Sequence, residues 1–188
     1  MKKLLLILVL LASVSCSYKN QKIVFNFDVE NENKSNSIEK KTFDLRVSDE
    51  RHNKKILGKK KFGQTRVNVF SEQNLADILK YKIKDNLVNQ GFIEGNDKIV
   101  EVRIKTLVYK AQRGFPIGTS EAKGVIRVDI KDSSGKNKEF SKNYTLEFKN
   151  KHFISSLSAT DEKNINNLLH ELVSDMMKDK ELIDNISN

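Results

Sequence analysis

The sequence predicts an α+β fold: a two-layer sandwich with a largely antiparallel sheet and two amphipathic helices on one face. Several segments alternate apolar and polar residues with the period of a half-buried strand. Two longer segments repeat apolar residues with helical spacing. Their order is strands, a helix, three strands and a second helix, so each helix must bury its apolar stripe against the sheet.

Six segments have the alternation of strands. They are residues 22–28, 42–47, 66–70, 98–110, 125–131 and 140–148. The turn sequence DSSGKN separates the last two segments, which are expected to form a hairpin. The polar residues 29–41 are expected to form a mobile loop, residues 48–64 a charged connection and residues 113–124 a further loop.

Two helices are expected from apolar residues at helical spacing. The first covers about residues 72–90, with Ser71 as its N-cap. The second begins near Ser158 to Asp161, where the S-x-x-D pattern is typical of a capped helix start. Residues 180–186 add a last short turn.

The first sixteen residues, MKKLLLILVLLASVSC, have the basic, apolar and small-residue regions of a secretory signal. The apolar run is shorter than the roughly 20 residues that a spanning helix needs. Its last four residues, S-V-S-C, resemble the lipobox of bacterial lipoproteins. The resemblance implies cleavage before Cys16 and a diacylglyceryl group on its sulfur. The alternative is a plain signal peptide followed by an incidental cysteine.

Cysteine usage favours lipidation. Cys16 is the only cysteine of the chain, whereas cysteines of exported proteins usually pair in disulfides. Acylation would consume the lone thiol. Ser17 resembles the pattern of outer-membrane lipoproteins. We therefore expect a signal peptide at residues 1–15, a lipidated tether at 16–21 and a single periplasmic α+β domain at 22–188.

The charge balance is basic, with a formal net charge of +9 over 188 residues. A basic chain raises the question of nucleic-acid binding, but the sequence has no recognition motif for it and carries an export signal. Anionic lipid head groups or other anionic envelope polymers suit that compartment better, and the alternative to both is a generally basic surface with no specific partner. We expect no nucleic-acid partner.

The motifs of metal and nucleophile chemistry are incomplete. His170 and Glu171 begin like a zinc-protease motif, but Ser174 stands where the second histidine is required. No G-x-S-x-G elbow occurs. We therefore predict no catalytic residues, no metal site and no cofactor.

Asp49 and Arg51 form a D-x-R pattern directly after a predicted strand, which favours a local ion pair. The pair either braces the turn or takes part in binding. Phe115 and Ile117 lie between two glycines. This apolar tip either inserts into a partner or membrane, or packs back onto the sheet.

A basic cluster follows the D-x-R pattern. Its members are Lys54, Lys55, Lys59, Lys60 and Lys61. The cluster is either a solvated loop or a surface patch attracted to anionic head groups, with each charge adding about 1 kcal/mol. Of these, Lys59, Lys60 and Lys61 are the candidate binding residues.

Three further segments resemble the YajG family of bacterial lipoproteins. They are VSDERHNKKILGKK, LADILKYKIKDNLVNQGF and NYTLEFKNKHFISSLSATDEKNINNLLHELVSDMMKDKELI. They follow in the same order over most of residues 42–187. The resemblance implies a small periplasmic envelope domain and brings no enzymatic activity or cofactor.

The expected function is binding. A lipid-anchored domain would serve as an accessory or adaptor toward an envelope protein or polymer. One alternative is a protein that binds an anionic lipid or glycan, or a small ligand in a pocket between the helices and the sheet. An enzyme is the remaining alternative, although the sequence shows no cluster of titratable residues for it.

Overall fold

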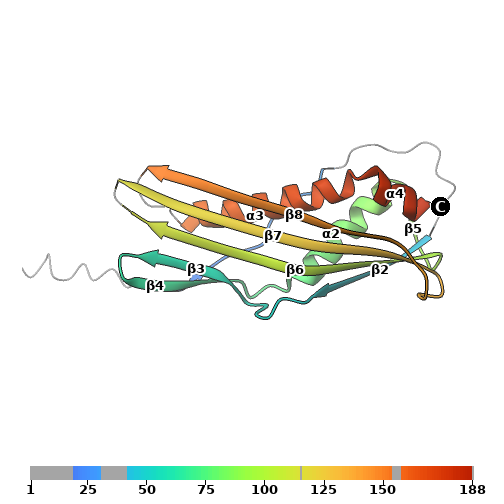
Figure 1. Ribbon diagram of the computed structural model, residues 1–188, viewed down its shortest axis with the longest axis horizontal. Coiled ribbons are helices and arrows are strands. Elements are labelled where there is room, and N and C mark those ends of the chain that lie inside the picture. Colours follow the sequence, from blue (N-terminus) through green and yellow to red (C-terminus); the bar gives the residue numbers. More distant parts are fainter. Residues whose placement is uncertain (1–18, 31–41, 115, 154–157, 188) are drawn as a thin grey trace, which may run out of the picture.

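The computed structural model describes residues 19–30, 42–114, 116–153 and 158–187. The α+β sandwich that the sequence predicts is confirmed (Figure 1). The strands are β1 (Gln21–Lys22), β2 (Thr42–Asp49), β3 (Ile56–Phe62), β4 (Thr65–Phe70), β5 (Ile93–Glu94), β6 (Lys98–Arg113), β7 (Ile117–Asp132) and β8 (Lys138–Phe153). The helices are α2 (Leu75–Asn89), α3 (Ser158–Met177) and α4 (Lys180–Ser187).

The long strand β6 organises the sheet. β7 runs antiparallel along one edge of β6, and β8 runs antiparallel along β7. The other edge of β6 is shared, because β2 pairs with its first half and β3 with its second half. Both of those pairings are parallel, while β3 and β4 form an antiparallel hairpin. The longest pairings are thus antiparallel, as predicted, within a mixed sheet.

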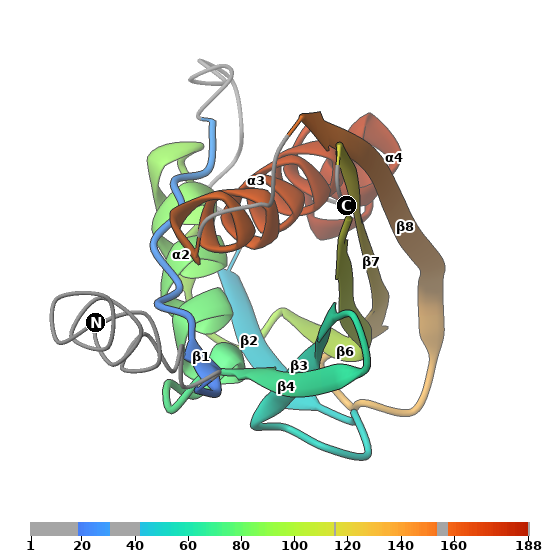
Figure 2. The same cartoon turned by 90° about the vertical axis from the view of Figure 1, so that its left-hand side faces the viewer.

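The helices lie on the concave side of the curved sheet (Figure 2). α2 packs against β2, α3 packs against β7 and β8, and α4 packs against β8. Their apolar stripes meet the inward residues of the strands in one core. The opposite face of the sheet carries no helix in the described part of the chain, and its side chains face outward.

The structure differs from the first predicted strand at residues 23–30, which we call the strap. The alternation is real, since Ile23, Phe25 and Phe27 are buried. However, only Gln21 and Lys22 pair with the sheet. The strap instead lies across α2 and α3, so its inward side chains enter the core from the helix side.

The Ile23 N–H donates to the Phe70 carbonyl of β4 at 2.8 Å, and beyond it side chains, mostly of the helices, provide the hydrogen bonds of the strap backbone. The Asn26 N–H donates to Asn166 Oδ1 at 2.9 Å, and the Asn166 side-chain amide donates to the Val24 carbonyl at 3.0 Å. His170 Nδ1 lies 2.6 Å from the Asp28 carbonyl oxygen and donates to it. Buried backbone groups need such partners, and beyond Ile23 they come from side chains rather than from a neighbouring strand.

The structure changes other boundaries too. The predicted connection 48–64 contains β3, and most of the predicted loop 113–124 belongs to β7. Asn74, not Ser71, caps the first helix, because its side chain accepts a hydrogen bond from the Ala76 N–H. The second helix starts at Ser158 as predicted, and the expected last short turn is the helix α4.

We predict that the strap is part of the cooperative core. Phe25→Ala should reduce the free energy of unfolding by about 3–5 kcal/mol, because it removes a ring that is 5% exposed. Val24→Ala is the matched control: this neighbour is 45% exposed, and the change should stay within about 0.5 kcal/mol. Urea unfolding measures both, and equal effects would contradict a structural role for the strap.

Candidate functional site

A row of charged side chains crosses the outer face of the sheet where four strands run together. Lys59 on β3 lies opposite Lys110 on β6. Lys110 lies opposite Glu121 on β7, which in turn lies opposite Lys149 on β8. Since successive side chains of a strand point to opposite faces, residues paired in this register share one face.

A second row lies beside the first, toward the β3–β4 turn. Arg66 on β4 pairs with Lys61 on β3, and Lys61 pairs with Gln112 on β6. Gln112 pairs with Thr119 on β7, and Thr119 with Lys151 on β8. Five strands therefore supply the two rows, and residues far apart in the sequence become neighbours.

The two rows border a hollow of about 710 Å³ on this face. We call it the basic groove. Its cationic lining residues are Lys59, Lys61, Arg66, Lys110, Lys149 and Lys151. Glu121 is the one carboxylate of the lining, and the half-exposed Val108 adds an apolar side chain.

Most charges of the groove are uncompensated. Lys149 is paired, with its Nζ 2.9 Å from Glu147 and 3.9 Å from Glu121, and the hydrogen bond to Glu147 raises the pKa of Lys149. Among the residues that the structure describes, the other five cations of the groove form no ion pair. Like charges on neighbouring strands repel one another, so a bound anion would relieve this repulsion.

Lys60 does not belong to this surface. It lies between Lys59 and Lys61, but it points to the helix side of the sheet and is 1% exposed. Its ammonium group pairs with the carboxylate of Asp161 in the first turn of α3. The prediction that Lys60 is part of an exposed patch is wrong, because strand alternation turns this one lysine inward.

Asp161 also accepts a hydrogen bond from the Tyr109 hydroxyl on β6. Burial lowers the pKa of Lys60, and Asp161 opposes that effect. Burial raises the pKa of Tyr109, and Asp161 adds to the increase. The three side chains thus form a buried polar cluster that joins β3, β6 and α3.

Ser120 and His152 lie beside this cluster, and their Oγ and Nε2 atoms are 2.7 Å apart. A serine–histidine catalytic pair also needs a carboxylate that orients the histidine. The nearby carboxylate, Asp161, uses one oxygen for Lys60 and the other for Tyr109. Ser120 is also only 4% exposed. These contacts favour a structural role for Ser120 and His152.

Asp49 and Arg51 form the ion pair that their spacing favours. Arg51 Nε donates to Asp49 Oδ1 at 2.9 Å and Nη2 to Oδ2 at 2.6 Å. Nη2 also donates to the Lys54 carbonyl at 2.8 Å. Both side chains are at most 5% exposed. The contacts are those of a brace between β2 and the following turn, and a binding role stays a prediction.

The five lysines of the predicted basic cluster therefore separate. Lys59 and Lys61 line the basic groove, whereas Lys60 is buried. Lys54 and Lys55 line a different hollow of about 430 Å³, between the end of β2 and the start of α2. The cluster is not one surface, because β3 begins within it.

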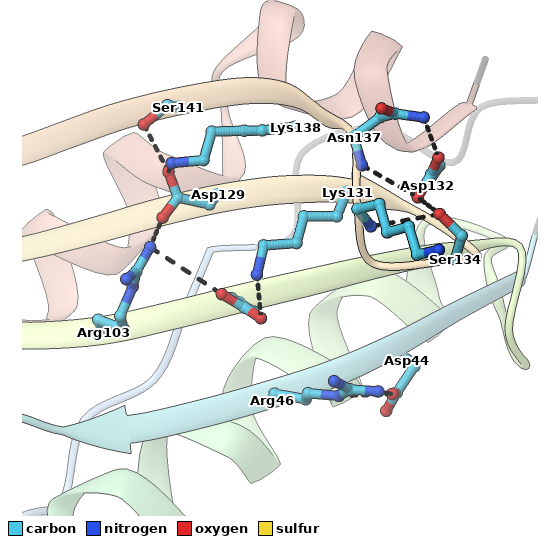
Figure 3. Close-up of polar contacts among 12 residues, drawn as sticks. Asp44, Arg46, Arg103, Asp129, Lys131, Asp132, Ser134, Asn137, Lys138 and Ser141 are labelled. Carbon is cyan, nitrogen blue, oxygen red and sulfur yellow. Dashed lines mark hydrogen bonds and ion pairs between the residues drawn. The ribbon is translucent and has the colours of Figure 1, made fainter.

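Asp129 lies farther along the outer face (Figure 3). It is 0% exposed, since Arg103, Lys138 and Ser141 contact its carboxylate from the two flanking strands. Asp132 is separate from it and accepts hydrogen bonds from Ser134 and Asn137 in the β7–β8 turn. The hydrogen bond from Ser134 lowers the pKa of Asp132, against a smaller effect of burial. This end of the face is therefore balanced in charge, unlike the groove.

Two of the predicted site residues, Cys16 and Phe115, lie outside the described residues. Ile117 begins β7 and is 48% exposed, so its side chain is available at the tip, and insertion into a partner stays a prediction. The described residues contain no group of three or more metal-ligating side chains. None of the helices they form is long and apolar enough to cross a membrane.

Sequence reasoning missed four of the six cations that line the groove. These residues are Arg66, Lys110, Lys149 and Lys151. One signal was available: lysines at i and i+2 occur at 59 and 61 and again at 149 and 151, and that spacing places both on one face of a strand. What links the two pairs is the strand order, which the spacing does not contain.

We predict that Lys60→Met strongly destabilises the fold. The substitution leaves the buried Asp161 carboxylate without its counter-ion, and breaking such pairs costs about 3–5 kcal/mol. Lys59→Met, at the exposed neighbouring position, should change the free energy of unfolding by less than about 0.5 kcal/mol. Urea unfolding of both variants is the measurement, and equal costs would show that the buried pair does not stabilise the fold.

We also predict a loss of stability at alkaline pH. Burial raises the pKa of Tyr109 and Tyr144 above the ordinary 10.0, and hydrogen bonds to Asp161 and Asp179 add to the effect. The folded state then keeps protons that the unfolded chain releases, so this stability is present below pH 10 and falls above it. At one pH unit above 10, each tyrosine should have lowered the free energy of unfolding by about 1.4 kcal/mol.

The lowered pKa of Lys60 acts in the opposite direction, because the unfolded chain binds that proton more tightly. Lys60 is present both in the unmodified protein and in the variant Tyr144→Phe, so its contribution cancels when the two are compared. Between about pH 9 and about pH 11, the variant should lose about 1.4 kcal/mol less than the unmodified protein. Urea unfolding at both pH values measures this, and an identical loss in the two proteins would rule out Tyr144 as a source.

Solved structures with a similar arrangement include protein XCC0632 from Xanthomonas campestris. It aligns with a TM-score of 0.56 at 11% identity, covering 84% of this chain and 91% of that chain. A minor lipoprotein from Acinetobacter baumannii aligns with a TM-score of 0.39 at 14% identity, covering 80% and 93%. A neuraminyllactose-binding hemagglutinin homolog from Helicobacter pylori gives 0.48 at 6% identity, covering 88% and 98%. The first similarity supports the fold alone. The other two alignments are weaker, with TM-scores of 0.39 and 0.48.

Sequence comparison identifies the family. The search of curated proteins finds no match. A family model described as "Uncharacterized lipoprotein" matches residues 29–187, which is most of the chain. The match covers β2 to α4, including every residue of the basic groove. The chain therefore belongs to this family of uncharacterised lipoproteins.

Proposed function

We propose that the protein is anchored to a membrane of the bacterial cell envelope through lipid on Cys16, and that its periplasmic domain works by binding an anionic partner. Membership of a lipoprotein family supports the anchor, and so does the lipobox resemblance around the only cysteine. Ser17 favours the outer membrane, and the resemblance to the YajG family belongs to the same proposal.

The observation that carries the binding role is the basic groove. Five cations without an ion pair in the described structure line one hollow of about 710 Å³. Exposed charges normally alternate in sign or disperse over a surface. Their concentration on one face, next to a charge-balanced region around Asp129, is the property of a surface for an anionic partner.

A carrier of apolar small ligands fits the structure less well. Such a protein needs an apolar cavity between the helices and the sheet. There, α3 contributes fully buried Leu168, Leu172 and Val173 to a continuous core. The groove lies on the opposite face and has a charged lining, so we propose an adaptor or accessory role in the envelope without catalysis or a cofactor.

In-cell crosslinking tests the proposal. The groove variant carries Lys59→Gln, Lys61→Gln, Lys110→Gln and Lys151→Gln, and the crosslinker is a photoactivated one that does not target lysine and can capture lipid, glycan or protein. Unmodified protein should capture a recurrent anionic envelope component, and the groove variant should lose about tenfold or more of it. Lys60 stays unchanged, because its substitution would disturb the buried pair.

A matched variant controls for net charge. It carries Lys80→Gln, Lys136→Gln, Lys163→Gln and Lys180→Gln, all at exposed positions outside the groove. It should capture the partner as the unmodified protein does, and both variants should unfold at the same urea concentration. Equal loss in the two variants, or full capture by the groove variant, would contradict a role for the groove.

The anchor is tested separately by Cys16→Ala in a chain whose apolar signal has been removed. This protein should leave the membrane fraction, because the acyl chains that hold it there are absent. A protein that remained wholly with the membranes would contradict attachment through Cys16. This result is independent of the groove variants.

A further inference from the structure

We infer that the basic groove binds the anionic lipid head groups of the bilayer that holds the Cys16 lipids, so that the outer face of the sheet lies against the membrane. The inference rests on the lipid anchor in the proposed function and specifies the partner of the groove. It follows from the place of the groove relative to the start of the domain and from the distribution of its charges.

The tether enters the domain beside the groove. β1 runs parallel to β4, with Gln21 opposite Val69, and Asn20 accepts a hydrogen bond from the Asn68 N–H at 3.0 Å. Asn68 in turn pairs with Lys59 of the groove. Strands are spaced by about 4.8 Å, so the backbone of Lys59 lies about 10 Å from Asn20.

The tether is also short. Asn20 lies four positions after Cys16, and an extended chain spans at most about 3.6 Å per residue. The lipidated residue therefore lies within about 14 Å of Asn20. A tether of this length lets the cations on β3 and β4 approach the membrane surface to within the Debye length of about 8–10 Å in physiological salt.

The direction of the chain agrees with this placement. Because β1 is parallel to β4, the chain enters β1 from the side of the β3–β4 turn. That turn, the β6–β7 turn and the end of β8 all lie at one end of the molecule, opposite the C-terminal helix α4 (Figure 1). The exposed Ile117 is at the same end.

The form of the groove suits a surface of many head groups. Its cations spread over β3, β4, β6 and β8, and four of the five unpaired ones are lysines. Lysine acts as a flexible point charge, whereas bidentate recognition of a single anion favours arginine. Tethering also raises the effective concentration of the membrane at the groove, so weak contacts to several phosphates suffice for docking.

The experiment uses the full lipidated protein, purified in detergent and reconstituted into two kinds of vesicle. One contains phosphatidylcholine alone, and the other contains phosphatidylcholine mixed with phosphatidylglycerol. The rate of lysine acetylation is then measured by mass spectrometry. Lys59, Lys61, Lys110 and Lys151 report on the groove, while Lys80 on α2 and Lys163 on α3 report on the helix side.

On the mixed vesicles, acetylation of the groove lysines should slow by about fivefold or more relative to phosphatidylcholine alone. The two helix lysines should react equally on both vesicles. Raised salt should abolish the difference, because it screens the attraction between the groove and the lipids. The groove variant is floated on the same vesicles. The acetylation rate of its remaining Lys149 reports its orientation on the membrane, and this rate should not depend on ionic strength.

Each other outcome overturns the inference in a distinct way. Protein that floats with both vesicles but shows equal acetylation of the groove lysines would refute head-group binding and leave the anchor intact. A groove protected only in cells, by a crosslinked protein that the groove variant loses, would assign it to a protein partner. Protein that floats with neither vesicle would refute the lipid anchor itself.

Discussion

The ion pair between Lys60 and Asp161 is the contact on which the rest of the domain depends. It joins β3 to the first turn of α3 across 101 residues of sequence, and Tyr109 adds β6 to the same cluster. A buried charge needs a partner and hydrogen bonds to be tolerated. The sheet and the helix layer must therefore meet in one arrangement, in which the ammonium and the carboxylate face each other.

The same constraint produces the candidate binding surface. With Lys60 turned inward, the alternation of β3 directs Lys59 and Lys61 outward. A shift of the strand by one residue would reverse all three side chains, burying two charges and exposing one. The register that satisfies Lys60 thus also aligns Lys59 with Lys110 and Lys61 with Gln112, which places the two rows of the groove together.

Much of the fold could be predicted because local patterns report local structure. The stripes of α2 and α3 and the alternation of β2, β4 and β6 depend only on which side chains face the core. The strap shows the limit, since its alternation indicates an extended chain with one buried side but not what supplies its hydrogen bonds. β3 was missed for a related reason: a lysine at a core position removes the apolar signal of a strand.

The sequence by itself determined the α+β class and the positions where the chain is basic, and it carries the resemblance to a lipobox around Cys16. The tertiary structure alone decided which lysines are buried, which share a face, and that β8 brings Lys149 and Lys151 to Lys59 and Lys61. The physical reason is that charge is a property of each residue, whereas burial and neighbourhood depend on long-range pairing. Strand order and register set that pairing, and no short segment of the chain contains them.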